Sequence, residues 1–403
     1  MNAVGIDVSK GTSTVAILRP FGEIVASPFK VTHTSSDLSE LTRKLKSLPG
    51  ETKVIMECTG SYHLPIATAL HDAGLTVCAA HAQLIHNFGN NTIRKVKTDP
   101  ADALKIANYG LTHWLEMPKF APEDEIRHIL KAYSRQYNKY NKLKTMLKNN
   151  LIALTDQTFP GVNELFTSTA RKSDGHEKWI DFFTQFWHCE RVCSVSEKTF
   201  TERYRKWCKR NGYNFSEAKA IGIYAASQGH IHIMPKTEAT ECLVTQAARQ
   251  ITTISETLAV IAGKMLLLAA SLPEYPVVIG FRGVGEILGP QLMAEIGDVF
   301  RYRQKSSLVR FAGLEPVANT SGKHQGNEKI SKQGSPHLRK TLFQVMNSLL
   351  KHPPAGDPVF MMLDRKRAEG KHYYSYMNAG AAKFLRIYYA RVREVLSIQN
   401  NEA

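Results

Sequence analysis

The chain has 403 residues, enough for two or three domains, and its 43% hydrophobic and 22% charged content is ordinary for a globular protein. Its 52 lysine and arginine residues exceed the 36 acidic residues by 16, which favours a polyanionic partner such as nucleic acid. No apolar run approaches the roughly 20 residues that span a bilayer, and the chain begins on a strand-like segment, so we expect a cytosolic protein without a membrane partner.

Residues 1–118 alternate between strand-like and helix-like segments. Strands are expected at 3–8, 13–19, 23–29, 53–57 and 76–80, and helices at 36–47, 63–73 and 101–110. Three early strands followed by strand–helix alternation predict a mixed α/β sheet covered by helices. That order matches an RNase H-like fold, in which the first strand carries an essential carboxylate.

The middle region, residues 119–275, is expected to be helical. Apolar residues at steps of three and four run from 126 to 154 and again from 243 to 268, which predicts two heptad helices in an antiparallel coiled coil, within one chain or between subunits. The stretch 161–236 between them is rich in tryptophan and phenylalanine. It is expected to be a separately packed insertion with these aromatic side chains in its core.

The first of the two long helices is strongly basic. Between Arg127 and Lys148 it carries seven lysine and arginine residues and no acid. Such a run is usually a solvated helix face, and a nucleic-acid face is an alternative of equal weight. In the second case Lys139, Lys142 and Lys148 contact a nucleic-acid backbone.

Residues 276–403 are expected to be mainly helical. Gly283-Val284-Gly285 between two short helical runs resembles a helix-hairpin-helix, whose backbone amides can bind a phosphate, so Gly283 and Gly285 are candidate nucleic-acid contacts. A polar loop over 319–334 precedes a helix capped by Ser335. This region supplies three further candidate contacts: Lys323, Lys332 and Arg339.

Four carboxylates of the first region are candidate metal ligands: Asp7, Glu57, Asp99 and Asp102. A carboxylate in a buried strand is costly unless it is paired or binds a cation, and this applies to Asp7 and Glu57. Asp99 and Asp102 lie three residues apart on one helix face, although capping and the helix dipole also account for acids there. Several converging carboxylates suit Mg²⁺, and Mn²⁺ is expected to substitute for it.

Ser321 and the cysteines carry weaker signals. A serine becomes a nucleophile only where a base or a positive environment activates it, and Ser-Gly in a polar loop is usually a turn. A zinc site could be drawn from His188, Cys189, Cys193 and Cys208, but their spacing fits no standard finger. Reduced, unpaired thiols are the preferred interpretation.

Taken together, the motifs of this chain resemble the DEDD transposases of bacterial insertion sequences, the RNA-guided bridge recombinases. The N-terminal motifs are Gly5-Ile6-Asp7-Val8-Ser9-Lys10, Glu57-x-Thr59-Gly60-x-Tyr62 and Lys97-Thr98-Asp99-x-x-Asp102-Ala103. The C-terminal motifs are Gly283-Val284-Gly285, Gly313-Leu314-x-Pro316, Ser321-Gly322-x-x-x-Gly326 and Ile330-Ser331-Lys332-x-Gly334-x-x-x-Leu338-Arg339. The resemblance covers residues 1–118 and 276 to about 350, and it rests on the joint order of the motifs.

The resemblance implies a RuvC-like domain over 1–118 whose Asp7, Glu57, Asp99 and Asp102 hold magnesium. It implies a transposase domain over 276–403 whose Ser321 attacks a DNA phosphate and forms a covalent phosphoserine intermediate. The implied partners are donor and target DNA, a structured non-coding guide (bridge) RNA that reads sequence by base pairing, and further copies of the chain. The implied assembly is a tetramer of two dimers with a composite active site, in the bacterial cytoplasm at the nucleoid.

Three alternative functions make different predictions. A magnesium-dependent, RuvC-like resolvase without serine chemistry would still cut DNA after Ser321→Ala. An actin-like ATPase is suggested by Asp7 to Thr14, although the second phosphate loop and the adenosine motif of that fold are not evident, and it would hydrolyse ATP. A non-catalytic nucleic-acid-binding protein would be unaffected by Asp7→Asn.

Overall fold

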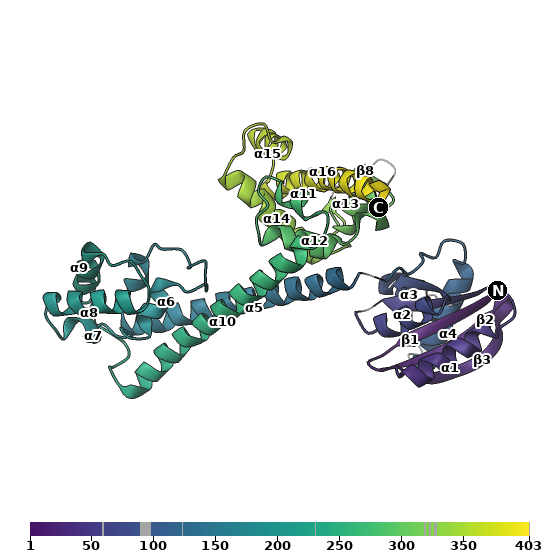
Figure 1. The fold of residues 1–403 in the computed structure, drawn as a ribbon, viewed down its shortest axis with the longest axis horizontal. Helices are drawn as coiled ribbons and strands as arrows, with labels where there is room; N and C mark the ends of the chain where they lie inside the picture. The colour runs from purple at the N-terminus through teal and green to yellow at the C-terminus, as the bar shows by residue number, and fades with distance from the viewer. Residues whose placement is uncertain are drawn as a thin grey trace. The chain divides into compact units, whose positions relative to one another are not determined.

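The computed structural model describes the chain except for residues 59, 89–97, 123, 230, 318–319, 322–323, 326–328 and 403. For residues 317, 320, 321, 324, 325, 329 and 399–402 the description is of the backbone alone. The chain divides into two compact units, Met1–Glu123 and Asp124–Ala403 (Figure 1). The expected three-part division, with boundaries at 118/119 and 275/276, stays a prediction.

The first unit is built on a mixed five-stranded sheet. Its strands are β1 (Asn2–Val8), β2 (Thr12–Arg19), β3 (Glu23–Thr32), β4 (Thr52–Cys58) and β5 (Thr76–His81), in the order β3-β2-β1-β4-β5. The pairs β1–β2 and β2–β3 are antiparallel, whereas β4 runs parallel to both β1 and β5. This mixed sheet confirms the sequence prediction, and its strand order is that of the expected RNase H-like fold.

Helices cover both faces of this sheet (Figure 1). They are α1 (Ser35–Lys46), α2 (Leu64–Asp72), α3 (Ala82–Phe88) and α4 (Asp99–Thr112), with a 3-10 turn at Pro20–Gly22. Val4 and Ile6 of β1 lie in one core together with residues of α1 and α2. Ala3 lies in the other core, with residues of α3 and α4. Alternate residues of β1 therefore face opposite helix layers.

Two long helices organise the second unit: α5 (Glu125–Thr158) and α10 (Glu238–Ala270). Each has one end in an aromatic core of the insertion and the other in a C-terminal core, with the chain directions reversed, so the helices run antiparallel (Figure 1). The two predicted helices are thus confirmed as a pair within one chain. A coiled-coil supercoil stays a prediction.

The apolar character of α10 exceeds what the sequence indicated. With 33 residues and a window of mean hydropathy 1.5, this helix could cross a membrane by length and composition alone. That corrects the expectation that no apolar run is long enough. In the structure Val244 and Ile251 pack in the insertion core and Met265 packs in the C-terminal core.

The insertion between the long helices has an aromatic core of its own. Its elements are a 3-10 turn (Val162–Leu165), α6 (Lys178–Phe183), α7 (Glu190–Cys193), α8 (Glu197–Arg210) and α9 (Glu217–Ala226). The side chains predicted to fill its core are all buried: Trp179, Phe182, Phe183, Phe186 and Trp187.

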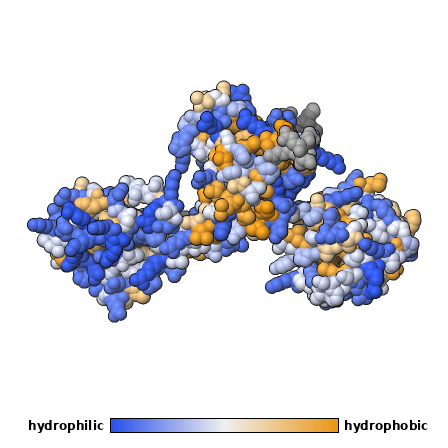
Figure 2. All heavy atoms as spheres, viewed as in Figure 1, coloured by the Kyte–Doolittle hydropathy of each residue, from blue (hydrophilic) through white to orange (hydrophobic). Residues whose placement is uncertain are grey.

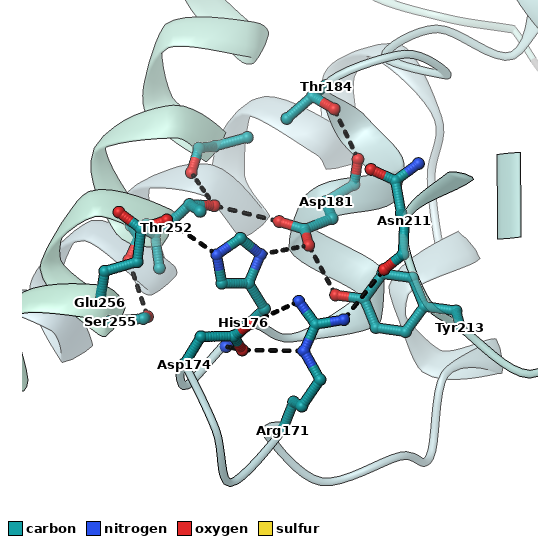
Figure 3. A network of polar contacts seen from close by, with 12 residues as sticks. Arg171, Asp174, His176, Asp181, Thr184, Asn211, Tyr213, Thr252, Ser255 and Glu256 are labelled. Atoms are coloured by element: carbon teal, nitrogen blue, oxygen red, sulfur yellow. Dashed lines mark hydrogen bonds and ion pairs between the residues drawn. The ribbon is translucent and has the colours of Figure 1, made fainter. Parts of the chain in front are cut away.

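A polar network fastens the start of the insertion to α10 (Figure 3). His176 lies between two carboxylates, with Nδ1 2.8 Å from Asp181 and Nε2 3.0 Å from Glu256. Tyr213 and Thr252 donate their hydroxyl hydrogens to Asp181, at 2.5 and 3.1 Å. Burial lowers the pKa of His176, but the two carboxylates outweigh it and leave the pKa raised. The ion pairs therefore stabilise the fold at low pH and are lost as pH rises through that pKa.

The C-terminal part is mainly helical, as predicted. It contains α11 (Tyr275–Ile279), α12 (Leu288–Ile296), a 3-10 turn (Val299–Arg301), α13 (Lys305–Phe311), α14 (Pro336–Lys351), α15 (Pro358–Ala368) and α16 (Tyr373–Glu402). Four two-residue strands lie between α13 and α14: β6 (Pro316–Val317), β7 (Thr320–Ser321), β8 (His324–Gln325) and β9 (Lys329–Ile330).

The Gly283 turn lies between α11 and α12, where a helix-hairpin-helix was expected. Gly283 has φ 77°, and an added Cβ would lie 2.9 Å from Leu349 Cγ of α14. Close packing against α14 therefore accounts for this glycine, whereas an added Cβ at Gly285 would meet open space. The helix-hairpin-helix stays a prediction.

Candidate active site

Two of the predicted carboxylates stand at the carboxyl ends of neighbouring parallel strands. Ile6 of β1 is in register with Met56 of β4, so Asp7 and Glu57 follow one residue later on each strand. Ile6 and Met56 belong to the core beneath α1 and α2. Because side chains alternate along a strand, Asp7 and Glu57 face the opposite layer, where α4 lies.

Gly5 brings the other two carboxylates to the same place. An added Cβ at Gly5 would lie 2.2 Å from the Ala103 carbonyl oxygen and 2.4 Å from the Ala107 nitrogen. The backbone of α4 therefore rests directly on β1, and its first turn carries Asp99 and Asp102. Thr98 is the N-cap of this helix, with its hydroxyl accepting from the Ala101 amide at 3.4 Å. The sequence also allowed Asp99 as the cap, but in the structure Thr98 takes that position and Asp99 is the first residue of the helix.

All four carboxylates line one cavity of about 500 Å³ in the first unit. The structure therefore brings together the whole predicted set: Asp7, Glu57, Asp99 and Asp102. His86 of α3 and Lys105 of α4 line the same cavity. Sequence reasoning missed these two residues, because α3 was not predicted and Lys105 stands outside the motifs.

The cavity carries an excess of negative charge. Burial, followed by the charges of Asp102, Asp99 and Glu57, raises the pKa of Asp7 to about 6. Burial and the charge of Asp102 also raise the pKa of Glu57, although Lys105, His86 and His81 oppose the rise. The repulsion between neighbouring carboxylates falls when one of them is protonated or when a cation binds. An all-carboxylate donor set fits a hard divalent ion that prefers oxygen ligands.

Replacing Gly5 by alanine is expected to disrupt this arrangement. The new methyl group would meet the α4 backbone, which cannot move aside as a flexible side chain could, so we expect a loss of about 3 kcal/mol in unfolding free energy. Urea denaturation of Gly5→Ala measures this loss. Gly222→Ala is a matched control, because a Cβ at Gly222 meets nothing within 4 Å. Equal stability of the two variants would contradict the close packing of α4 on β1.

Ser321 lies in a short hairpin of the second unit. Strands β7 and β8 are antiparallel, and Ser321 is in register with His324. Ser321 is thus the last residue of β7, and strands β6 and β9 form a second antiparallel pair in the same segment of the chain. The candidate contact Lys323 lies outside the described residues.

The base of the hairpin is tied closely to α13 and α14. The Lys332 amide donates to the Gly313 carbonyl at 3.1 Å, and an added Cβ at Gly334 would lie 2.3 Å from the Phe311 carbonyl oxygen. Arg339 donates to the Ala312 carbonyl at 2.9 Å. The motif glycines and Arg339 therefore anchor the hairpin, a role that the motifs alone did not reveal.

A larger cavity of about 1200 Å³ adjoins the hairpin base. Four cationic side chains line it: Lys332, Arg339, Lys340 and Arg386. Lys332 and Arg339 were predicted nucleic-acid contacts, whereas Arg386 of α16 is too distant in sequence to have been associated with them. A cavity with this charge suits a phosphate group.

Several basic side chains of α5 form ion pairs with acidic residues elsewhere in the chain, which the sequence of the helix alone did not indicate. Three glutamates from other segments pair with it. Arg127 forms a buried ion pair with Glu274, and Arg135 lies 3.2 Å from Glu295. Lys144 and Lys148 both contact Glu177, at 2.9 and 2.7 Å.

Lys148 therefore has a structural partner in the insertion. Lys139 and Lys142 are exposed, and neither forms an ion pair within the described part of the chain. These two lysines are the better candidates for a nucleic-acid contact.

Comparisons with known proteins match both units. A DEDD transposase model of the IS110 type matches residues 4–160, and a model described as "Transposase IS116/IS110/IS902 family" matches residues 277–359. The 44.8 kDa protein of insertion element IS116 from Streptomyces clavuligerus is 20% identical over 394 residues, covering 97% of this chain and 94% of that protein. The 42 kDa protein of insertion element IS900 from Mycobacterium paratuberculosis is 26% identical over 191 residues, 46% of each chain.

Solved structures of RuvC from Thermus thermophilus also align with this chain. RuvC itself aligns at 14% identity and TM-score 0.24, covering 30% of this chain and 100% of RuvC. RuvC in complex with a Holliday junction substrate aligns at 12% identity and TM-score 0.24, covering 30% and 99%.

A mixed sheet with clustered carboxylates, matched together with the C-terminal part by transposase models, defines the class of this protein as a DNA transposase. The chain belongs to the IS110/IS116 family of insertion-sequence transposases. DNA is therefore its partner, and the cleavage and transfer of DNA strands is its activity.

Proposed function

We propose that this transposase binds two Mg²⁺ ions through Asp7, Glu57, Asp99 and Asp102 and cuts and rejoins DNA through a phosphoserine formed at Ser321. The observation that carries the proposal is the convergence of the four carboxylates on one cavity, together with the raised pKa of Asp7. When bound, such ions polarise the scissile phosphate and stabilise the leaving oxygen.

In the proposed reaction a bond forms between Ser321 Oγ and phosphorus while the bond from phosphorus to a deoxyribose oxygen breaks. The serine proton passes to a carboxylate, and the sugar hydroxyl leaves with a proton from solvent. The energy of the phosphodiester is conserved in the protein–DNA bond, so rejoining needs no ATP. The cationic cavity at the hairpin base supports the proposal, because Lys332 and Arg386 line it and their positive charge would attract a DNA phosphate.

The carboxylates and Ser321 belong to different units of the chain. We therefore propose a composite site formed within a tetramer of two dimers. Exposed apolar side chains on the long helices support self-association, among them Met146 of α5 and Val260 and Leu267 of α10. Figure 2 shows hydrophobic surface gathered where the C-terminal helices meet the helix pair.

Target choice is proposed to depend on a guide RNA. A structured RNA that pairs with donor and target would read their sequence, while the protein contacts the backbone. The DNA that flanks the gene tests this directly. A structured non-coding stretch with short matches to the element junction and the insertion site is expected, and its absence would count against RNA guidance.

The proposal is tested by a strand-transfer assay with the full chain, the flanking RNA, Mg²⁺ or Mn²⁺, and labelled junction DNA. A band of protein-linked DNA that survives denaturation and depends on the metal is expected. Cleaved DNA with no protein-linked band would favour the alternative, a RuvC-like nuclease that uses water in place of serine.

Replacing Lys139 and Lys142 by alanine is expected to weaken nucleic-acid binding in a salt-dependent way. If each contacts one phosphate, the slope of log affinity against log salt should fall by about two units. Binding titrations at several salt concentrations measure the slope. Lys206→Ala with Lys209→Ala removes the same charge from exposed positions on α8 and serves as the control. Equal slopes for the two double variants would show that Lys139 and Lys142 contact solvent and not the nucleic acid.

A further inference from the structure

Three side chains of metal-binding type meet in the insertion, where α7 begins and the chain approaches α10. One ligand atom each from His188, Cys189 and His232 lies within 4.8 Å of the other two. The Cys189 sulfur is 3.8 Å from His188 Nδ1 and 3.9 Å from His232 Nδ1. In a tetrahedral zinc site with ordinary bond lengths, sulfur and nitrogen ligands lie about 3.6 Å apart. The two sulfur–nitrogen distances need to shorten by only a few tenths of an ångström.

The outer nitrogen of each histidine is already held. His188 Nε2 lies 3.0 Å from the Met234 carbonyl oxygen, and His232 Nε2 lies 3.4 Å from a Glu190 carboxylate oxygen. Each acceptor favours a hydrogen on Nε2, which leaves the Nδ1 lone pair to face the sulfur. Carbonyl and carboxylate partners of this kind orient histidine ligands in metal sites. The Glu190 amide also lies 3.2 Å from His188 Nδ1, and a bound metal would replace that hydrogen bond.

The burial of the cluster suits a structural metal. His188 and Cys189 are buried, whereas the His232 side chain is 28% exposed, which leaves a path for entry. Cys193 is half-buried and lies one helical turn after Cys189 but is not a member of the cluster, so water is the expected fourth ligand. Cys208 shares the aromatic core with Cys189 but lies beside Tyr204 and is not a member of the cluster. The zinc site considered from the sequence therefore included two residues of the observed cluster, His188 and Cys189, but not the third, His232.

We propose that His188, Cys189 and His232 bind one Zn²⁺ ion that closes the insertion. Cys189 and His232 are 43 residues apart, and α8 and α9 lie between them. The amides of Ile233 and Met234 also bond to the Gln157 carbonyl at the end of α5. The metal would thus fasten both ends of the α8–α9 segment beside the helix pair. This role is independent of the carboxylate cavity, which lies in the other unit.

The experiment uses the full chain without an added histidine tag, dialysed against Zn²⁺ and then against metal-free buffer. Elemental analysis is expected to find about one zinc per chain, and Co²⁺ in its place is expected to give an intense thiolate-to-metal absorption. Cys189→Ser and His232→Asn should lose the bound zinc, and Glu190→Gln should weaken zinc binding about tenfold. Asp7→Asn and Cys242→Ser should retain it, because Asp7 lies in the carboxylate cavity and Cys242 is exposed on α10.

The cobalt spectrum of the unmodified chain keeps the test independent of variants that fail to fold. An absent thiolate band would overturn the proposal and leave the cluster as a buried hydrogen-bonded group. Zinc that persists in folded Cys189→Ser, or is lost in Asp7→Asn, would also overturn it.

Discussion

Ser321→Ala is expected to abolish covalent protein–DNA adducts while leaving DNA and RNA binding unchanged. The substitution removes the only atom of that side chain that can bond to phosphorus, so adducts should fall below detection rather than decline by degrees. The alanine fits the strand position, since β7 contributes its pairing through the backbone. Denaturing gels of labelled junction DNA measure the adduct, and filter binding measures affinity.

Ser331→Ala is the matched control for this variant. Ser331 belongs to the same loop, and its backbone amide donates to the Glu315 carbonyl at 2.9 Å, a bond that alanine retains. The control should form adducts at the unmodified rate. Adducts that persist in Ser321→Ala would remove Ser321 as the nucleophile, whereas cleavage without adducts in the unmodified protein would support the resolvase alternative.

Asp7→Asn is expected to produce opposite effects on activity and stability. Loss of a ligand should lower metal-dependent DNA cleavage about a hundred- to a thousandfold, the scale of removing one group that stabilises charge in a transition state. The metal-free protein, in contrast, should become more stable above pH 6, because the variant removes a charge that is disfavoured by burial and repelled by three carboxylates. We expect a gain on the order of 1 kcal/mol, since solvent screens a half-buried charge.

The direction of the expected stability change follows from the pKa of Asp7. The pKa of Asp7 is raised from 3.8 to about 6 in the folded protein, so ionisation costs more there than in the unfolded chain. The metal-free protein should therefore lose stability between about pH 4 and 6, and Asp7→Asn should lose less over that interval. Thermal melts at several pH values, with and without Mg²⁺, measure the pH-dependent stability and its response to the metal. Asp72→Asn, on the exposed end of α2, is the control. A variant that is destabilised and still responds to Mg²⁺ would contradict the metal role of Asp7.

The strands and long helices could be predicted because their signals are local. Apolar runs such as Val54-Ile55-Met56 and the heptad pattern of α10 specify an element without reference to the rest of the chain. Asp7 and Glu57 followed from the same reasoning, since an acid within a buried run demands a partner, whereas Asp99 and Asp102 followed from their three-residue spacing on one helix face. α3 escaped prediction because seven residues, Ala82–Phe88, are too few to display a helical period.

Contacts between distant segments could not be predicted. Nothing near Lys148 in sequence indicates Glu177, which neutralises it from the insertion, 29 residues away. The partner of Cys189 in the zinc proposal, His232, is separated from it by two helices. Gly5 was recognised within a motif. The need for glycine there, which is that the α4 backbone lies directly on β1, is visible only in the folded structure.

The antiparallel arrangement of α5 and α10 has a consequence for the order in which the chain folds during synthesis. The second half of α5 packs on the insertion, so its contacts are completed by residues made soon afterwards. The first half holds Leu130, which packs against residues of α12, α14 and α16, and Arg127, whose partner Glu274 is 147 positions later. An emerging chain must therefore carry half of one helix without these partners until roughly the last third of the protein leaves the ribosome.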